Sequence, residues 1–220
     1  MAAAALTIDI VSDVVCPWCY IGKRRLEAAL ALPEAADLPA VEVRWHPFQL
    51  NPDMPAGGVS RQQYLEDKFG GPERATEIYA RVKAAGRTAG LELNIEGITL
   101  QPNTLAAHAL IAFAQQDGGK AGNDIKERVL KAYFVENRFI GSADVLAEIA
   151  GEAGLDPDAA RRFVSDPERL QAVAQADAQA RSMGISGVPF FIFNQKLAVS
   201  GAQDPATLLD AMQQAVAAAG

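Results

Sequence analysis

The stretch SDVVCPWCYIG at residues 12–22 decides how this chain begins to fold. Immediately upstream, residues 6–10 alternate between apolar and polar side chains, which is typical of a half-buried strand. Pro17 suits the first position of a helix, because proline lacks the N–H group that would be unpaired there. We therefore predict a strand that ends at Ser12–Asp13 and a helix that begins near Cys16.

The two cysteines of the chain lie at this junction between strand and helix. Cys16 and Cys19 are three positions apart, so a helix places both thiols on one face, within reach of a disulfide. At the helix start, free N–H groups and the helix dipole stabilise an anion, which makes Cys16 the expected nucleophile. Cys19 lies one turn further and is the expected resolving thiol, which attacks a mixed disulfide formed at Cys16.

A second strand and a carboxyl-terminal unit complete an α/β pattern. Residues 41–46 alternate and end at Pro47, and the helical crossover favours parallel pairing with the first strand. Strand character returns at Val188–Phe193, and a turn leads into Leu197–Ser200, which is typical of a hairpin. Asp204–Pro205 then begins a last helix that extends to about Ala219.

The signals from about Ser60 to Met183 are nearly all helical. Capping residues and glycine or proline breaks predict helices over 60–70, 72–89, 102–119, 123–137 and 142–154, and from Asp156 and Asp166 onward, with an irregular segment at 91–99. The helix opened by Pro102–Asn103 is expected to end at Gly118–Gly119. The predicted fold is α/β: a βαβ–ββα domain (residues 1–58 and 184–220) with a large all-helical insertion (residues 59–183).

Composition limits the classes of function. The chain has 220 residues and a net charge of −7, which argues against nucleic acid as a partner because phosphate binding needs a basic face. No segment approaches the roughly 18 continuous apolar residues of a membrane helix, and Met1–Ile8 lacks the basic start of a secretory signal. We therefore expect a cytoplasmic protein, in which a close cysteine pair serves catalysis or metal binding rather than structure.

Two other readings of the cysteine pair stay open at this point. The pair is compatible with reduced thiols that only pack in the core. With His46 and His108 it also makes a zinc site arithmetically possible, although these histidines lack the local spacing usual in zinc fingers. Gly187-Val188-Pro189 before the last strands is, on local sequence alone, a strand boundary.

Several motifs, in order along the chain, resemble the DsbA-like thioredoxin-fold family and, within it, the FrnE-like branch. They are residues 12–22, HPFQLNP at 46–52, Pro102-Asn103-Thr104 with His108, GVPFF at 187–191 and SGAQ at 200–203. The resemblance implies a thioredoxin domain with a helical insertion and an enzyme that catalyses thiol–disulfide exchange. It further implies that Cys16 is the nucleophile, that Cys19 resolves, and that Pro189 follows a cis peptide bond.

The resemblance also implies a substrate site around the cysteine pair. Main-chain groups of Val188 are expected to pair with an extended substrate chain, and His108 lies on a helix expected near the cysteines. The candidate substrate-binding residues are Pro17, Trp18, Val188, His108 and Phe48. The expected substrates are protein or small-molecule disulfides and thiols, with no bound cofactor and no metal, and with glutathione as a candidate redox partner.

Three further expectations concern charge and alternative functions. Residues 23–25 (KRR) are expected on a solvated helix face, and Asp9 or Asp13 in capping or turn positions. A runner-up function is a glutathione-dependent isomerase or transferase of the kappa and hydroxychromene-carboxylate isomerase type, with Ser200–Gly201 and Asp204 near the glutathione carboxylate. A non-enzymatic alternative is a zinc-binding chaperone. The sequence predicts no oligomeric state.

Overall fold

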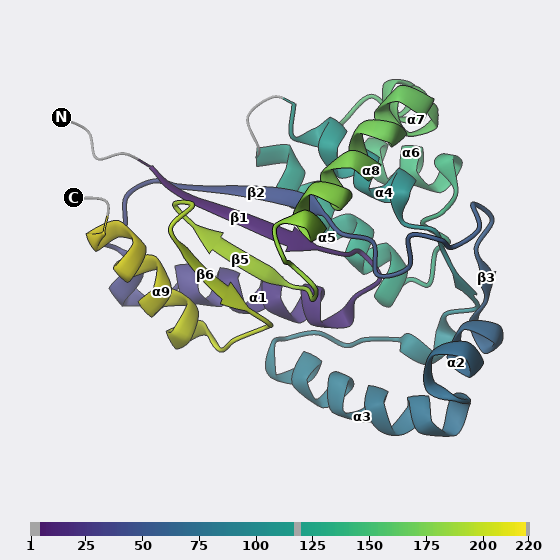
Figure 1. The fold of residues 1–220 in the computed structure, drawn as a ribbon, viewed down its shortest axis with the longest axis horizontal. Helices are drawn as coiled ribbons and strands as arrows, with labels where there is room; N and C mark the ends of the chain where they lie inside the picture. The colour runs from purple at the N-terminus through teal and green to yellow at the C-terminus, as the bar shows by residue number, and fades with distance from the viewer. Residues whose placement is uncertain (1–4, 117–119, 219–220) are drawn as a thin grey trace.

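The computed structural model describes residues 5–116 and 120–218, and its centre is a four-stranded sheet (Figure 1). The strands are β1 (Leu6–Ser12), β2 (Val41–Pro47), β5 (Phe190–Phe193) and β6 (Leu197–Ser200), in the order β2-β1-β5-β6. β1 and β2 are parallel, with Ile10 opposite Trp45, whereas β5 and β6 are antiparallel to their neighbours. The predicted βαβ and ββα units are therefore confirmed.

Two helices pack together on one face of this sheet, α1 (Pro17–Leu30) and α9 (Pro205–Ala217) (Figure 1). Leu6, Ile8 and Ile10 of β1 are at most 1% exposed and belong to the main hydrophobic core. Pro17 occupies the start of α1, and Asp204 caps α9 by accepting a hydrogen bond from the Thr207 N–H, both as predicted. The cysteine motif is thus fixed to the sheet by the helix that covers it.

The segment between β2 and β5 is largely helical, as predicted. Its helices are α2 (Arg61–Phe69), α3 (Pro72–Thr88), α4 (Leu105–Ala114), α5 (Lys120–Phe134), α6 (Ala143–Glu152), α7 (Pro157–Ser165) and α8 (Pro167–Ser182). Ser60, Ser142, Asp156 and Asp166 accept the backbone hydrogen bonds of helix caps. α5 and α8 pack against β2, whereas α3 packs against α1, away from that edge of the sheet (Figure 1).

A small sheet and two 3₁₀ turns were not predicted. β3 (Val59–Ser60) pairs with β4 (Leu100–Gln101), and single 3₁₀ turns form at Pro33–Ala35 and Ile95–Gly97. Strands of two residues are too short for an alternating pattern to show in the sequence. α4 ends at Ala114, with Gln115 as its cap, so the helix stops short of the end predicted at Gly118–Gly119. The end predicted near Ala219 lies outside the described residues, and the domain boundaries at 58 and 184 stay predictions.

The outer edge of β2 is covered by a side chain rather than by a strand. The amide of Gln115, just past α4, accepts a hydrogen bond from the Trp45 N–H at 2.7 Å and donates to the Trp45 carbonyl at 3.0 Å. Both groups of one backbone residue are therefore paired by one side chain, in the manner of a neighbouring strand.

Gly22 gives a first testable prediction, because α1 passes close to Pro189 there. A Cβ atom at Gly22 would lie 2.9 Å from Pro189 Cγ and 3.3 Å from Phe191 Cζ. Alanine normally stabilises a helix by about 1 kcal/mol relative to glycine, but overpacking typically costs about 1–3 kcal/mol. We expect Gly22→Ala to lower the free energy of unfolding by about 1 kcal/mol, measured by denaturant titration.

Gly151 provides the matched control for this measurement. It lies inside α6, and its added Cβ would only reach Pro157 Cβ at 3.7 Å, an ordinary contact. Gly151→Ala should therefore stabilise the protein by a few tenths to about 1 kcal/mol. Equal shifts of the unfolding midpoint in the two variants would show that the contact between Gly22 and Pro189 has no energetic weight.

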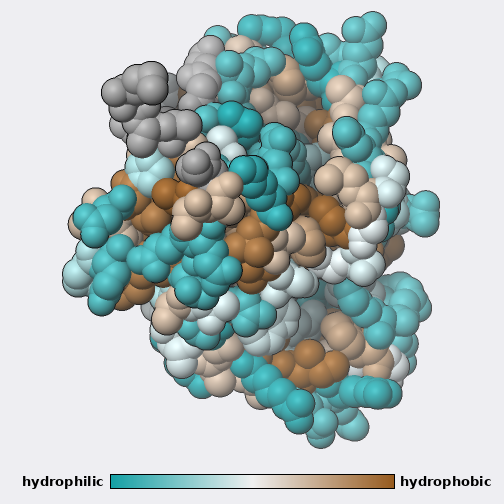
Figure 2. Space-filling view, turned by 60° about the vertical axis from the view of Figure 1, so that its left-hand side comes forward, coloured by the Kyte–Doolittle hydropathy of each residue, from teal (hydrophilic) through white to brown (hydrophobic). Residues whose placement is uncertain are grey.

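Some hydrophobic residues reach the surface. Figure 2 shows exposed hydrophobic residues in several separate places among hydrophilic ones. Among the residues that the structure describes, the exposed large hydrophobic side chains are Trp18, Ile78, Leu100 and Met183. Among residues 5–116 and 120–218, no helix is long and apolar enough to cross a membrane.

Candidate active site

Cys16 stands at the amino terminus of α1, one residue before the helix proper. Its backbone is extended, with φ −92° and ψ 112°, and its side chain makes no capping hydrogen bond to the helix. Its carbonyl accepts hydrogen bonds from the N–H groups of Cys19 at 3.0 Å and Tyr20 at 3.4 Å. The first turn of the helix thus brings Cys19 under Cys16, and the two residues are 5% and 1% exposed.

The two thiols have opposite pKa shifts. The hydrogen bond from the Cys19 side chain lowers the pKa of Cys16, with help from the N–H groups of Cys19 and Trp18, and this outweighs burial and the charge of Asp13. Burial raises the pKa of Cys19 well above its usual value, and the hydrogen bond to Cys16 and the charge there raise it further. Cys16 is therefore suited to be a thiolate nucleophile, whereas Cys19 is protonated near neutral pH.

The peptide bond between Val188 and Pro189 is cis and lies opposite the cysteine pair. Cys16 Sγ is 3.6 Å from the carbonyl oxygen of Val188, although the two residues are far apart in the sequence. The Pro189 carbonyl accepts a hydrogen bond from the Gly201 N–H at 2.8 Å, which ties this loop to the start of the turn before α9. Trp18 is 39% exposed, so it is open to solvent beside these buried groups.

A buried carboxylate lies beneath the motif. Asp13 is fully buried; one oxygen accepts from the Val14 N–H and lies 3.2 Å from His108 Nε2, and the other accepts from the Leu50 N–H at 2.7 Å. Burial alone would raise the pKa of Asp13, but the hydrogen bond and charge of His108, then the Leu50 N–H, lower it overall. Asp13 is therefore an ionised anchor that joins the cysteine loop to α4.

The loop that carries Leu50 is fixed in turn by α8. Asp177 accepts a hydrogen bond from the Gln49 N–H at 2.8 Å and pairs with Arg181 at 2.9 Å. The Arg181 guanidinium donates to the Gln49 carbonyl and lies 4.1 Å from the ring centre of Phe48. Phe48 is 2% exposed, so it supports the site by packing in the core.

The expectation of a solvated face at residues 23–25 is wrong for Lys23. Its side chain is 2% exposed, and its ammonium pairs with Glu27 and, at 2.8 Å, with Glu127 of α5. Arg24 is 36% exposed and also pairs with Glu127. The reason is that α1 packs against α5, and Glu127 of α5 supplies the carboxylate that pairs with Lys23. The sequence around Lys23 gives no indication of this distant partner.

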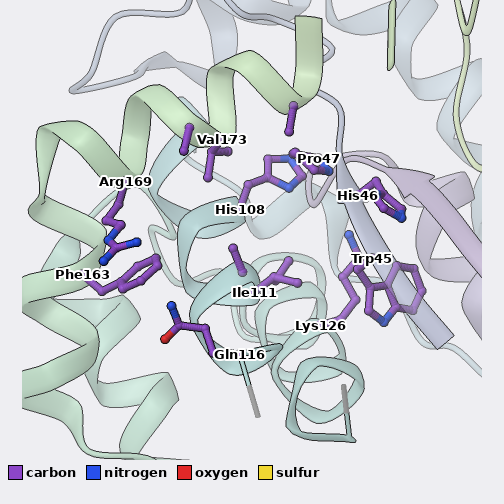
Figure 3. A pocket seen from close by; sticks show the side chains of 13 residues that line it. Trp45, His46, Pro47, His108, Ile111, Gln116, Lys126, Phe163, Arg169 and Val173 are labelled. Atoms are coloured by element: carbon purple, nitrogen blue, oxygen red, sulfur yellow. The ribbon is translucent and has the colours of Figure 1, made fainter. Parts of the chain in front are cut away.

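A cavity of about 260 Å³ lies next to this network rather than at the cysteines (Figure 3). It lies between β2, α4, α5, α7 and α8, and neither cysteine is among its lining residues. Figure 3 shows Lys126 beside Trp45 on one side and Arg169 with Phe163 on the other. His108 lines the cavity and contacts Asp13, so the cavity and the cysteine loop share one polar network.

The structure brings together most of the residues that the sequence singled out. Cys16, Cys19, Val188 and Pro189 form one cluster with Pro17 at the helix start. His108 is 4% exposed and reaches this cluster only through Asp13, and Phe48 lies in the core, so as substrate contacts both stay predictions. Asp177, Arg181 and Lys126 were missed, because nothing in their local sequence indicates which distant residues they meet.

The two histidines face carboxylates. His46 Nε2 is 2.8 Å from Asp9, and His108 is 3.2 Å from Asp13. Within the part of the chain that the structure describes, no group of three or more His, Cys, Asp or Glu residues is placed to hold a metal ion. Each histidine is therefore paired with a carboxylate in this structure.

The fold and the site define a thioredoxin-fold protein with a cysteine pair at a helix amino terminus and an opposing cis-proline loop. A model of the DSBA-like thioredoxin domain matches residues 7–213, almost the whole chain. The chain therefore belongs to the DSBA-like thioredoxin domain family, and the resemblance noted from its motifs is confirmed at that level.

Individual proteins agree with this membership. The uncharacterized protein YwbO of Bacillus subtilis (strain 168) is 30% identical over 190 residues, which are 84% of this chain and 85% of YwbO. The probable DsbA oxidoreductase SCO1869 of Streptomyces coelicolor has a TM-score of 0.84 and 30% identity, covering 96% of this chain and 89% of its own. The cytosolic disulfide reductase DsbM of Pseudomonas aeruginosa, solved with GSH, has a TM-score of 0.60 and 18% identity over 97% and 96%.

Proposed function

We propose that this protein is a dithiol–disulfide oxidoreductase that uses Cys16-Pro17-Trp18-Cys19 on protein or small-molecule disulfides. The observation that carries the proposal is that the pKa values of the two thiols are shifted in opposite directions. Cys16, beside the Val188 carbonyl, has a lowered pKa, and Cys19, one helical turn further on, has a raised pKa and is protonated. A pair that only packs in the core would need neither the helix terminus nor this asymmetry.

The reaction follows from the positions of the two sulfurs. The Cys16 thiolate attacks one sulfur of a substrate disulfide, forms a mixed disulfide, and releases the other sulfur as a thiolate that takes a proton from water. Cys19 then loses its proton and attacks Cys16 Sγ, so that the Cys16–Cys19 disulfide forms and the second substrate thiol leaves. Two electrons pass from the cysteine pair to the substrate, and the reverse sequence oxidises a dithiol.

The loop at Val188–Pro189 is the proposed contact for an extended substrate chain. The Val188 carbonyl lies beside the nucleophile, and it is an acceptor for a backbone N–H of the substrate next to the sulfur under attack. Trp18 is exposed at the rim of the site and offers apolar contact. Both features recognise main chain and apolar surface rather than one particular side chain, which suits varied disulfide substrates.

We further propose that the protein belongs to the FrnE-like branch, acts in the cytoplasm and uses glutathione as a redox partner. DsbM, a cytosolic disulfide reductase with the same fold, was solved with GSH, which supports this choice. The alternative of a glutathione-dependent isomerase is less well supported, because the negatively charged Asp204 already caps α9 where the glutathione carboxylate was expected.

The reduction potential of the cysteine pair tests this proposal. After equilibration in glutathione buffers, alkylation of free thiols should show Cys16 and Cys19 changing together, with a midpoint between about −270 and −120 mV, the range of thioredoxin-fold enzymes. A value below the cytosolic glutathione poise indicates a reductase, and a higher value indicates an oxidant or isomerase. Thiols that stay reduced across the whole series would contradict the function.

A further inference from the structure

Lys126 is a buried cation whose partner is not a carboxylate. It lies in the middle of α5, its side chain is 0% exposed, and its Nζ donates to Ser12 Oγ at 2.6 Å. The ammonium also lies 5.1 Å from the ring centre of Trp45. Among residues 5–116 and 120–218, Lys126 forms no ion pair with a carboxylate. Because a fully buried lysine is rare unless a charge compensates it, the residue needs an explanation.

The compensating charges come from the cysteine loop. Ser12, which binds Lys126, directly precedes Asp13, and the Asp13 carbonyl accepts a hydrogen bond from the Cys16 N–H at 3.4 Å. The other ionisable groups that face Lys126 or line its cavity are Asp13, Cys16, Cys19, Lys23, His46, His108 and Arg169. Burial lowers the pKa of Lys126 to about 8, whereas charge on Cys19, Asp13 and Cys16 raises it and Lys23 lowers it.

This arrangement links the charge of Lys126 to the state of the cysteines. When the pair is reduced, a thiolate at Cys16 supports an ammonium nearby. When the disulfide forms, that negative charge disappears, and burial then favours the neutral amine. The Ser12 hydroxyl fits both states, because it can accept a hydrogen bond from an ammonium and donate one to an amine. The Asp13 carboxylate stays charged in both states, but it is hydrogen-bonded to His108 and to the Val14 and Leu50 N–H groups rather than to Lys126.

We propose that Lys126 is the redox-linked proton-exchanging group of the cysteine pair, charged when the pair is reduced and neutral when it is oxidised. The inference rests on the proposed function. When the pair is oxidised in the proposed reaction, a disulfide forms from the Cys16 thiolate and the Cys19 thiol, and the Lys126 ammonium becomes an amine. Two protons and two electrons are released, and a substrate disulfide takes up both to become two thiols. Lys126 acts through its charge and is a positioning residue, not a group that touches substrate.

The reduction potential as a function of pH tests this directly near pH 7, which is below the pKa of about 8 of Lys126, so that the ammonium is still largely protonated. For a two-electron couple a tenfold change in equilibrium constant is 29.6 mV. The wild-type protein should exchange two protons, so its equilibrium constant should change about a hundredfold per pH unit, or about 59 mV. Lys126→Met leaves only the Cys19 proton, and its change should fall to about tenfold per pH unit, or about 30 mV.

Two further variants separate charge and proton exchange from simple packing. Lys126→Arg keeps a cation that cannot lose its proton, so its equilibrium constant should also change only about tenfold per pH unit. Its reduction potential should be higher, and therefore more oxidising, than that of Lys126→Met, because the cation stabilises the Cys16 thiolate of the reduced protein. Lys131→Met is the matched control, because Lys131 lies on the same helix with a side chain that is 57% exposed. It should keep the wild-type slope. Thermal unfolding of all four proteins checks that the variants are folded.

A proton count on the wild-type protein keeps the inference testable even if the variants do not fold. Oxidation of the reduced protein in weakly buffered solution with an indicator dye should release two protons per disulfide formed. One proton per disulfide, or the same slope in Lys126→Met and wild type, would overturn the role of Lys126 while leaving the oxidoreductase intact. Absence of any reversible Cys16–Cys19 couple would instead overturn the proposed function itself.

Discussion

Replacing Cys16 with serine should abolish reduction of insulin disulfides and isomerase activity, a fall on the order of a hundredfold or more. Cys16 is the thiol of lowered pKa at the helix terminus, beside the Val188 carbonyl, and in the proposed reaction it makes the first bond to the substrate. A serine hydroxyl is not ionised near neutral pH and forms no disulfide. The turbidity assay for insulin reduction, with a dithiol or glutathione as reductant, measures the loss directly.

The substitution changes one atom in the core, so folding is a small concern that is easily checked. The circular dichroism and the denaturant midpoint of Cys16→Ser should be close to those of the wild-type protein. A folded Cys16→Ser variant that retained the wild-type rate of insulin reduction would refute the proposed function. The site would then have to act without the residue that the structure places at its centre.

Cys19→Ser should have the opposite signature, in which a covalent complex accumulates. Cys19 is 1% exposed and has a raised pKa, so it does not react with substrates from solution. Its proposed role is to break the mixed disulfide at Cys16, and without it that mixed disulfide should become the main form of the protein. Mass spectrometry or a non-reducing gel after incubation with oxidised glutathione or a disulfide-containing protein should reveal the adduct.

Comparison with Cys16→Ser gives this experiment its control. The Cys16→Ser variant should form little or no adduct under the same conditions, because its remaining thiol is buried and protonated. Equal adduct formation in both variants would mean that the two thiols are equivalent, which contradicts the assignment of roles. An adduct on Cys19 alone would reverse the roles.

The parts of the fold that depend on neighbours in the sequence could be predicted. Ser60, Ser142 and Asp156 cap helices through backbone groups two or three residues away, and such short-range hydrogen bonds leave a pattern in the chain. The parallel pairing of the first two strands followed from the helix that connects them. The cysteine pair could be predicted for the same reason. Its chemistry depends on the position of Cys16 and Cys19 in the first turn of a helix, and these few neighbouring residues show that turn in the sequence.

The parts that depend on distant residues could not be predicted. Asp13 meets His108 across 95 positions, and Lys126 meets Ser12 across 114. Nothing in the sequence near Lys126 distinguishes it from an exposed lysine, because its burial is decided by the packing of α5 against the sheet. Pro189 was placed opposite the cysteines by resemblance to a family, and not by any local pattern.

The amide of Gln115 has a consequence for how copies of this protein meet one another. An unpaired edge strand is a template on which another chain can add its own strand, which is a common route to aggregation. Since Gln115 occupies both backbone groups of Trp45, a foreign strand cannot continue its hydrogen bonds past that residue along β2. The other outer strand of this sheet, β6, is only four residues long, so neither border offers a long uninterrupted template for intermolecular pairing.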